Sequence, residues 1–380
     1  MKTLSTGNQE DILELTQHLP TPLLVIDLEQ VRENIRQIRQ ALPQAALFYA
    51  VKCNTDPRVL ATVQQMNAGF EIASISEAKM VLQRGAPVER ILCFHPVKSP
   101  DFLRFLHHRR IDVLAADSID ELDKLAAHAP GSRVVIRVSV PNDGSLVPLS
   151  RKFGAEPDQA TELFRYAAAR GLVPYGITIH VGSQCERLET WSRARTICQQ
   201  VYRQTSSTGI NLSLISLGGG FPVPYTNDSL SLAAIGEVTN DALAELAISA
   251  NCAISVEPGR AVVANAGTLI ATVIGLAERT DGSWAYIDAG VYHGLFEAAP
   301  VAGRIPYPIT VRHSDRQVRV YNVGGPTCDG FDLPFERLRL PELRIGDRIA
   351  VRYAGAYSTA MTTEFNGFSA PTIHYLEDIL

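Results

Sequence analysis

The sequence lacks the cysteine patterns that mark disulfide-rich or zinc-binding proteins. Its 380 residues include only six cysteines, with no Cys-x-x-Cys pair and no Cys/His spacing typical of zinc. We therefore expect reduced thiols, as in a cytoplasmic protein, and no metal site. The six are Cys53, Cys93, Cys185, Cys198, Cys252 and Cys328.

The sequence also lacks a large excess of charge and long apolar runs. Lys and Arg together number 35 and Asp and Glu 40, for a formal net charge of -5, so the composition does not point to nucleic acid. No run approaches the roughly 20 apolar residues of a membrane span, and residues 1–10 lack a signal-peptide core. We expect a soluble cytoplasmic protein that acts on a small molecule, without a nucleic-acid or membrane partner.

What is present is an alternation of short apolar strands and amphipathic helical patterns. After a helical pattern over 28–42, the sequence predicts eight strands, and a helical pattern follows each of the first seven along the chain. This number and spacing fit an α/β fold of the (β/α)8 TIM barrel type better than an open doubly wound sheet. The expected strands are 47–51, 70–73, 91–94, 113–115, 134–138, 177–180, 214–217 and 254–256, and the helices are 57–67, 76–84, 101–108, 118–127, 157–170, 188–204 and 230–249.

From residue 267 onward the pattern changes to strands separated by Gly, Pro and Asp turns. We expect a β-sandwich or barrel-like domain here, joined by the N-terminal strand over 21–26. The sequence thus predicts a barrel over 28–266 and a β domain made of 1–27 and 267–380. Its expected strands are 268–277, 284–288, 309–312, 318–323, 348–353 and 372–376.

Lys52 follows the first barrel strand, within the segment Phe48–Asn54 (FYAVKCN). An ammonium at the end of a buried strand is either paired or has its pKa lowered by burial. A lysine with a lowered pKa is a nucleophile toward aldehydes. The simpler interpretation is a lysine that has reached solvent.

Three other features fall at the carboxyl ends of predicted strands, where barrel enzymes hold their active sites. They are His180–Ser183, Gly218–Gly220 and Glu257–Arg260. Each alone has an ordinary explanation, as a core histidine, a glycine turn or a salt-bridge carboxylate. Together they offer the flat ring of His180 and the carboxylate of Glu257. The backbone N–H groups of the glycine turn and the cation of Arg260 are suited to binding a phosphate.

These groups are the ones needed to hold pyridoxal 5′-phosphate. A lysine forms a Schiff base with the aldehyde of that cofactor, and a carboxylate keeps its pyridine nitrogen protonated so that the ring withdraws electrons. We therefore predict pyridoxal 5′-phosphate as the cofactor.

Seven motifs, in order, resemble those of the ornithine/diaminopimelate/arginine decarboxylase family of fold type III pyridoxal enzymes, particularly its ornithine decarboxylase-like members. The resemblance runs from about residue 20 to the end of the chain. It implies an alanine racemase-like barrel and a head-to-tail homodimer in which the β domain contributes to the partner's active site. The motifs are YAVKCN (49–54), HVGS (180–183), GGGFP (218–222), EPGR (257–260), GPTCDGFD (325–332), GAY (355–357) and FNGF (365–368).

The resemblance also implies roles for individual residues. Lys52 binds the cofactor aldehyde, Glu257 pairs with the pyridine nitrogen and His180 stacks on the ring. These three residues and Cys328 are the catalytic residues. Cys328 acts in the partner's site, where it returns a proton to the α carbon, and Asp329 holds the distal ammonium of the substrate there. Further cofactor-binding residues are Glu71, Glu77, Arg137, Ser183, Gly218, Gly219, Gly220, Gly259, Arg260 and Tyr357, the last of which also faces the substrate.

Two departures from the family pattern bear on the substrate. Glu71 stands where the family usually has aspartate, which keeps the charge but lengthens the side chain. Ornithine decarboxylases typically supply a second carboxylate within residues 290–304, where this chain has Glu297 and an added positive charge, Arg304. Glu297 suits a cationic substrate side chain, whereas Arg304 suits an anionic group on a larger substrate.

The sequence therefore predicts a carboxy-lyase acting on a basic L-amino acid, in first place L-ornithine to putrescine in polyamine biosynthesis, with lysine or 2,4-diaminobutyrate as related substrates. One alternative is decarboxylation of a conjugated amino acid in siderophore or antibiotic metabolism. A racemase on the same fold would need a cation facing the pyridine nitrogen, where this chain has Glu257. A non-catalytic homologue would not need Lys52, Glu257 and Cys328.

Overall fold

The computed structural model describes the chain except for residues 1–10, 150, 227, 241–251 and 300–304. The described residues form two compact units. The barrel unit consists of Arg32–Pro224 and Asp228–Val262, and the β unit of Met1–Val31, Tyr225–Asn227 and Val263–Leu380. The barrel predicted over 28–266 extends slightly beyond the barrel unit at both ends.

In the barrel unit, eight described strands form one parallel sheet in the order β4-β3-β2-β11-β10-β8-β6-β5. The outer strands meet through Cys93, whose N donates to Val113 O at 3.1 Å and whose O accepts from Ala115 N at 2.9 Å. The sheet therefore closes on itself, and the predicted TIM barrel is confirmed. The strands are β2 (Ala45–Ala50), β3 (Gly69–Glu71), β4 (Ile91–Leu92), β5 (Val113–Ala116), β6 (Arg133–Arg137), β8 (Val173–Thr178), β10 (Leu214–Ser216) and β11 (Ala253–Val256).

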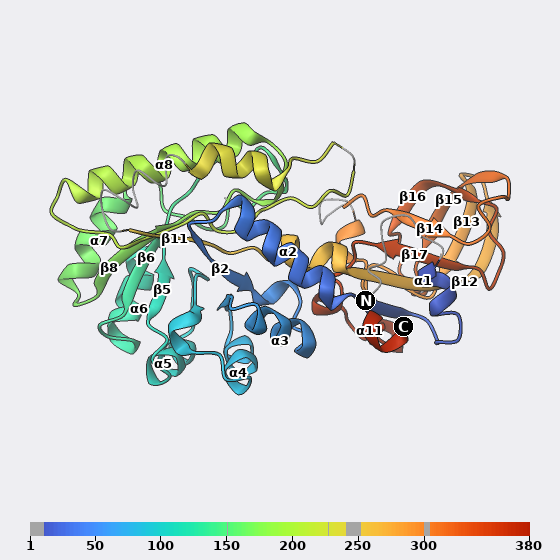
Figure 1. The fold of residues 1–380 in the computed structure, drawn as a ribbon, viewed down its shortest axis with the longest axis horizontal. Helices are drawn as coiled ribbons and strands as arrows, with labels where there is room; N and C mark the ends of the chain where they lie inside the picture. The colour runs from blue at the N-terminus through green and yellow to red at the C-terminus, as the bar shows by residue number, and fades with distance from the viewer. Residues whose placement is uncertain (1–10, 150, 227, 241–251, 300–304) are drawn as a thin grey trace. The chain divides into compact units, whose positions relative to one another are not determined.

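Helices α3 to α8 lie outside these strands (Figure 1). Helices α3 to α6 each begin with a side-chain cap: in α5, Ser99 Oγ accepts from Phe102 N at 3.2 Å and Pro100 occupies the first position. Residues 232–240 are also helical. Of the helix predicted over 230–249, the first two residues are not helical, and residues 241–249 lie outside the described residues. The helices are α2 (Leu28–Ala41), α3 (Pro57–Gln65), α4 (Ile75–Gln83), α5 (Pro100–His108), α6 (Ile119–His128), α7 (Ala160–Ala169), α8 (Leu188–Ser206) and α10 (Arg260–Val263), with short 3-10 turns η1 (Val51–Cys53) and η2 (Val88–Arg90).

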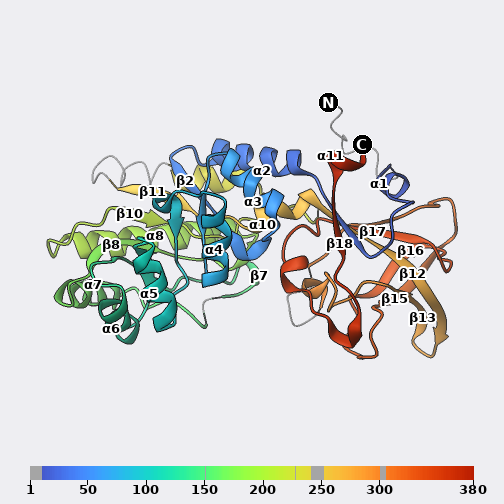
Figure 2. The same cartoon turned by 90° about the horizontal axis from the view of Figure 1, so that it is seen from below.

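The β unit is built around the long strand β12 (Gly267–Arg279), which pairs with β1, β13 and β17 (Figure 2). As predicted, the N-terminal strand β1 (Leu23–Ile26) joins this sheet, antiparallel to β12 and parallel to β18. All four β1 residues are buried. The other elements are β13 (Gly282–Ile287), β14 (Ile309–Val311), β15 (Val318–Gly324), β16 (Phe335–Pro341), β17 (Arg348–Arg352), β18 (Thr372–Tyr375), α1 (Asp11–Leu15), α11 (Leu376–Ile379), η3 (Ala264–Ala266), η4 (Phe296–Ala298), η6 (Thr359–Met361) and η7 (Phe365–Gly367).

Several local predictions were wrong. The strands predicted over 70–73, 91–94 and 177–180 end two residues earlier, at Glu71, Leu92 and Thr178. The first barrel strand ends at Ala50, one residue early, because a 3-10 turn begins at Val51. The long loop expected between 141 and 154 contains β7 (Ser145–Val147), which pairs with the unpredicted β9 (Ser183–Cys185). Strand β16 was not predicted because several charged residues interrupt its apolar pattern.

None of the helices in the described ranges combines the length and apolar character needed to span a bilayer. Within the same ranges, no group of three or more His, Cys, Asp or Glu side chains is arranged to hold a metal ion.

Candidate active site

The predicted cofactor-binding residues of the barrel unit come from the carboxyl ends of its strands. Glu71 ends β3, Arg137 ends β6, and Glu257 directly follows β11. The glycine turn Gly218–Gly220 follows β10. Because the strands are parallel and neighbouring, these residues share one end of the barrel.

Lys52 lies in the 3-10 turn η1 after β2. Its Nζ is 3.2 Å from Glu71 Oε2, and its side chain is 45% exposed whereas that of Glu71 is 2% exposed. The ammonium is therefore paired rather than buried, which is the first of the two states expected for it. The exposed amine remains accessible to an aldehyde.

Glu257 is a buried carboxylate with two hydroxyl donors on one oxygen. Ser216 Oγ donates to Oε1 at 2.5 Å and Thr178 Oγ1 at 3.3 Å. Burial, followed by the negative charge of Glu71, raises the pKa of Glu257 to about 7, while Ser216, Lys52 and Arg137 act in the opposite direction. A protonated ring nitrogen beside this group would favour its charged form.

The turn Gly218–Gly220 has a backbone that requires glycine. Gly218 has φ 66° and Gly220 has φ 105°. A Cβ on Gly218 would lie 2.0 Å from Ile179 O, and one on Gly220 would lie 2.3 Å from Gly182 O. A Cβ on Gly219 would lie 3.1 Å from His180 Nε2, so the missing side chain keeps space open beside the predicted stacking ring.

Arg260 and Ser183 meet although they lie far apart in the sequence. Arg260 is 4% exposed, and its Nε and Nη2 donate to Ser183 Oγ at 3.3 and 3.1 Å. The buried guanidinium of Arg260 and the hydroxyl of Ser183 are therefore joined in a form suited to a phosphate.

Gly259, next to Arg260, packs closely against the turn that carries Lys52. A Cβ on Gly259 would lie 3.0 Å from Cys53 Cβ.

His180 presents a neutral ring. Its Nδ1 accepts from Gly182 N at 3.0 Å. Burial, with the positive charges of Arg137 and Lys52, holds the pKa of His180 well below its usual range. An uncharged flat ring is suited to stacking on another aromatic ring.

Glu77 and Arg137 have local contacts that explain their placement. Ser74 Oγ caps α4 by accepting from Glu77 N at 3.2 Å, and Glu77 Oε2 accepts from Ala73 N, one residue before the cap, at 2.7 Å. Arg137 lies over the Phe153 ring at 5.4 Å, and burial lowers its pKa. The cofactor-supporting roles of Glu77 and Arg137 stay predictions.

In the β unit, Cys328 and Asp329 are each held by a side chain that was not predicted. The N and Sγ of Cys328 both donate to Asn366 Oδ1, at 3.1 and 3.2 Å. Tyr292 Oη donates to Asp329 Oδ2, and this bond holds the pKa of Asp329 below its usual range. The Tyr292 ring packs against Phe365 with centroids 4.8 Å apart.

Glu297 lies in the short turn η4 and is 7% exposed. Tyr357 has a left-handed backbone with φ 53°. Arg304 lies outside the described residues. The predicted site residues thus form one cluster in the barrel unit and another set in the β unit, and their union in a single site stays a prediction.

Four supporting residues were given no role from the sequence: Ser216, Thr178, Tyr292 and Asn366, although Asn366 stands in the motif FNGF (365–368). Thr178 and Ser216 each stand two positions before a predicted site residue, His180 and Gly218 respectively. Since side chains alternate along a strand, this spacing could have indicated hydroxyls near the site.

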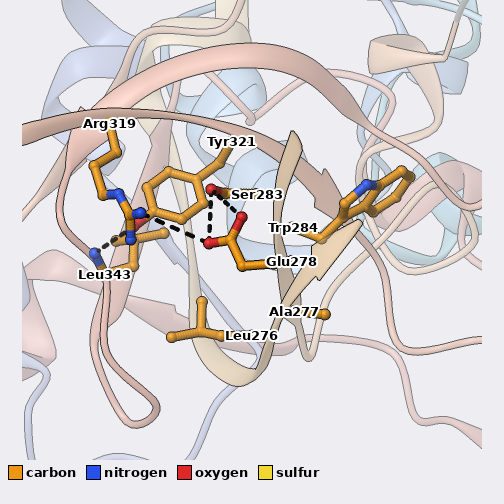
Figure 3. A pocket seen from close by; sticks show the side chains of 8 residues that line it. All are labelled: Leu276, Ala277, Glu278, Ser283, Trp284, Arg319, Tyr321 and Leu343. Carbon is orange, nitrogen blue, oxygen red and sulfur yellow. Dashed lines mark hydrogen bonds and ion pairs between the residues drawn. The ribbon is translucent and has the colours of Figure 1, made fainter. Parts of the chain in front are cut away.

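Two hollows are lined by described residues. One, of about 220 Å³, lies in the β unit and is lined by side chains that include Glu278, Ser283 and Arg319, which point toward one another (Figure 3). The other, of about 390 Å³, lies by the first turns of α4 and α5. It borders the barrel-unit cluster, because Ala73, which lines it, donates its N–H to Glu77 Oε2 at 2.7 Å. Neither hollow is lined by a predicted site residue. The site is therefore identified by the polar side chains at the carboxyl ends of the barrel strands, and not by a hollow.

Comparison with known proteins places these residues in context. Residues 28–264 match the family described as pyridoxal-dependent decarboxylase, pyridoxal binding domain. A lysine/ornithine decarboxylase of Selenomonas ruminantium is 33% identical over 368 residues, which are 96% of this chain and 92% of that protein. An ornithine decarboxylase of Schizosaccharomyces pombe is 33% identical over 371 residues, with coverage of 94% and 84%.

A solved structure is similar over its whole length. The lysine/ornithine decarboxylase complexed with cadaverine from Vibrio vulnificus has a TM-score of 0.89 and 30% sequence identity to this chain. The match covers 98% of this chain and 100% of that one. The likeness therefore includes the β unit as well as the barrel unit.

Proposed function

Because the chain belongs to the pyridoxal-dependent decarboxylase family, we propose that it removes the α-carboxylate of a basic L-amino acid, in first place L-ornithine, to give putrescine for polyamine biosynthesis. The observation that most directly supports this proposal concerns Asp329. The hydrogen bond from Tyr292 lowers the pKa of Asp329, so its carboxylate is ionised, and Asp329 is next in sequence to the thiol of Cys328. A fixed anion beside a candidate proton donor suits a substrate with a distal ammonium. Lysine and 2,4-diaminobutyrate are related candidates.

The barrel unit binds and orients the cofactor. Pyridoxal 5′-phosphate, when bound, supplies an aldehyde and an electron-withdrawing ring. Lys52 provides the amine for that aldehyde, and Glu257 holds a proton at the ring nitrogen. Arg260 and Ser183 bind the phosphate, and His180 packs on the ring with its uncharged face.

The β unit supplies the groups that act on the substrate. Cys328 delivers a proton to the α carbon after the carboxylate has left, and Asp329 binds the distal ammonium. We propose that both act in the site of a second copy of the chain, in a homodimer with two shared sites. Cytoplasmic localisation also belongs to this proposal, and it is supported by six cysteines free of disulfides.

The test is a panel of L-amino acids, including ornithine, lysine, arginine and 2,4-diaminobutyrate, with carbon dioxide and the amine product both measured. We expect turnover of ornithine, with K52A as the inactive control. If none of the basic amino acids is turned over at a rate typical of primary metabolism, the conjugated-substrate alternative replaces this proposal.

A further inference from the structure

The hydroxyl of Ser216, the last residue of β10, connects two parts of the cofactor site. Ser216 is fully buried. Its Oγ donates to Glu257 Oε1 at 2.5 Å and accepts from Gly218 N at 3.1 Å. A hydroxyl has one proton to donate and lone pairs to accept, so both contacts form at once. Ser216 therefore links the carboxylate after β11 to the glycine turn after β10.

A second hydroxyl acts on the same carboxylate oxygen. Thr178 Oγ1, at the end of β8, donates to Glu257 Oε1 at 3.3 Å. The strands β11, β10 and β8 are consecutive in the barrel, so the three side chains come from adjacent strand ends. With both donors on Oε1, the carboxylate plane is fixed and Oε2 remains for a donor from the cofactor. Donors to a carboxylate also favour its charged form.

We propose that Ser216 is a positioning residue for the cofactor ring: its hydroxyl turns Glu257 Oε2 toward the ring nitrogen and ties that orientation to the phosphate-binding turn. This inference rests on the proposed function, in which Glu257 faces the ring nitrogen. Ser216 thus supports the contact between Glu257 and the ring nitrogen, in addition to accepting a hydrogen bond from Gly218 N.

The chain provides a matched control in Ser255. Ser255 is the register partner of Ser216 on the neighbouring strand β11 and is equally buried. Its hydroxyl has no hydrogen-bond partner among the described residues. S255A therefore removes the same atom from the adjacent strand without removing a hydrogen bond.

The experiment titrates the cofactor-free protein with two ligands, followed by absorbance and protein fluorescence. The ligands are pyridoxal 5′-phosphate and its 1-deaza analogue, in which a C–H group replaces the ring nitrogen. We expect S216A to weaken binding of pyridoxal phosphate about tenfold, the effect of losing a hydrogen bond to a charged group. Binding of the deaza analogue should change less than about threefold. S255A should change neither affinity, and S216T, which keeps a hydroxyl, should restore most of the loss.

Equal weakening for both ligands would overturn the inference, since Ser216 would then act through the turn or the fold alone. No weakening for either ligand would overturn it as well. If S216A does not fold, as judged by circular dichroism, T178A provides the same comparison through the longer bond, and a loss shared by both ligands again overturns it. Failure of the unmodified protein to bind pyridoxal phosphate would instead overturn the proposed function.

Discussion

Lys52 and Glu257 show how single charges are controlled at the barrel end. Lys52 remains half-exposed and is paired with the buried Glu71. Glu257 is buried, and its pKa rises because desolvation and the charge of Glu71 outweigh the hydroxyl and cationic partners. The two charges are therefore controlled differently: an ion pair with Glu71 balances that of Lys52, whereas burial and the charge of Glu71 raise the pKa of Glu257.

The raised pKa of Glu257 predicts a pH-dependent stability of the cofactor-free protein. Its carboxyl group has a pKa of about 7 in the folded protein, against an ordinary value of 4.5. The folded state therefore holds the proton more tightly, so this group's stabilising effect is complete below pH 4.5 and is lost as pH rises through 7. The loss amounts to about 3 kcal/mol in the free energy of unfolding.

The measurement is urea unfolding of wild type and E257Q at several pH values between 5 and 8. We expect wild type to lose more stability than E257Q as pH rises, because glutamine does not titrate. Parallel curves for the two proteins would contradict the raised pKa of Glu257.

Asn366 provides a second test at the residue scale. It has a left-handed backbone with φ 56°, and its amide oxygen accepts from both N and Sγ of Cys328. N366G tolerates this backbone and removes the amide, so we expect kcat to fall about tenfold with KM little changed. N366D keeps an acceptor oxygen and should retain more activity. A KM change without a kcat change would contradict a role in holding the thiol.

At the scale of elements, the glycine turn after β10 is tightly constrained. It is held at both ends, since Gly218 O accepts from Glu257 N at 2.8 Å and Gly220 O accepts from Cys185 N at 2.9 Å. Its positive φ angles and close approaches leave no room for a side chain. Cofactor binding should therefore depend on this turn more than on glycines elsewhere.

This dependence can be tested by comparing G218A with G209A. Gly209 also has a positive φ of 87°, but a Cβ there meets nothing within 4 Å. We expect G209A to cost about 1 kcal/mol of stability from backbone strain and to leave cofactor affinity unchanged. G218A adds a clash and should weaken pyridoxal phosphate binding more than about tenfold. Equal affinities for the two variants in an absorbance titration would count against a phosphate-binding turn.

At the scale of the whole molecule, the predicted residues are divided between the two units. Lys52, Glu257 and Arg260 belong to the barrel unit, whereas Cys328 and Asp329 belong to the β unit. A shared site in a homodimer would unite the two groups across copies of the chain.

Complementation tests this arrangement. K52A and C328A homodimers should each have little activity. Mixing them in equal amounts under conditions that exchange subunits should restore about a quarter of wild-type activity, because half of the dimers then contain one intact site of two. Restoration that depends on exchange supports shared sites, while no restoration despite exchange, shown by tagged subunits, would argue that each site is built from one chain.

The sequence by itself determined the barrel, the N-terminal strand of the β unit and the motif residues. Buried strands and amphipathic helices leave a periodic record, and glycine turns are visible where only glycine fits. Strand β16 and the β7–β9 pair were not predicted because their residues do not show the regular apolar pattern of a buried strand.

Only the tertiary structure decided which side chains meet. Ser216 and Thr178 reach Glu257 because β8, β10 and β11 are neighbours in the closed sheet. Asn366 reaches Cys328 across 38 positions of the chain. Hydrogen bonds between distant residues depend on strand order and loop geometry, and the spacing of residues along one segment does not encode either of these.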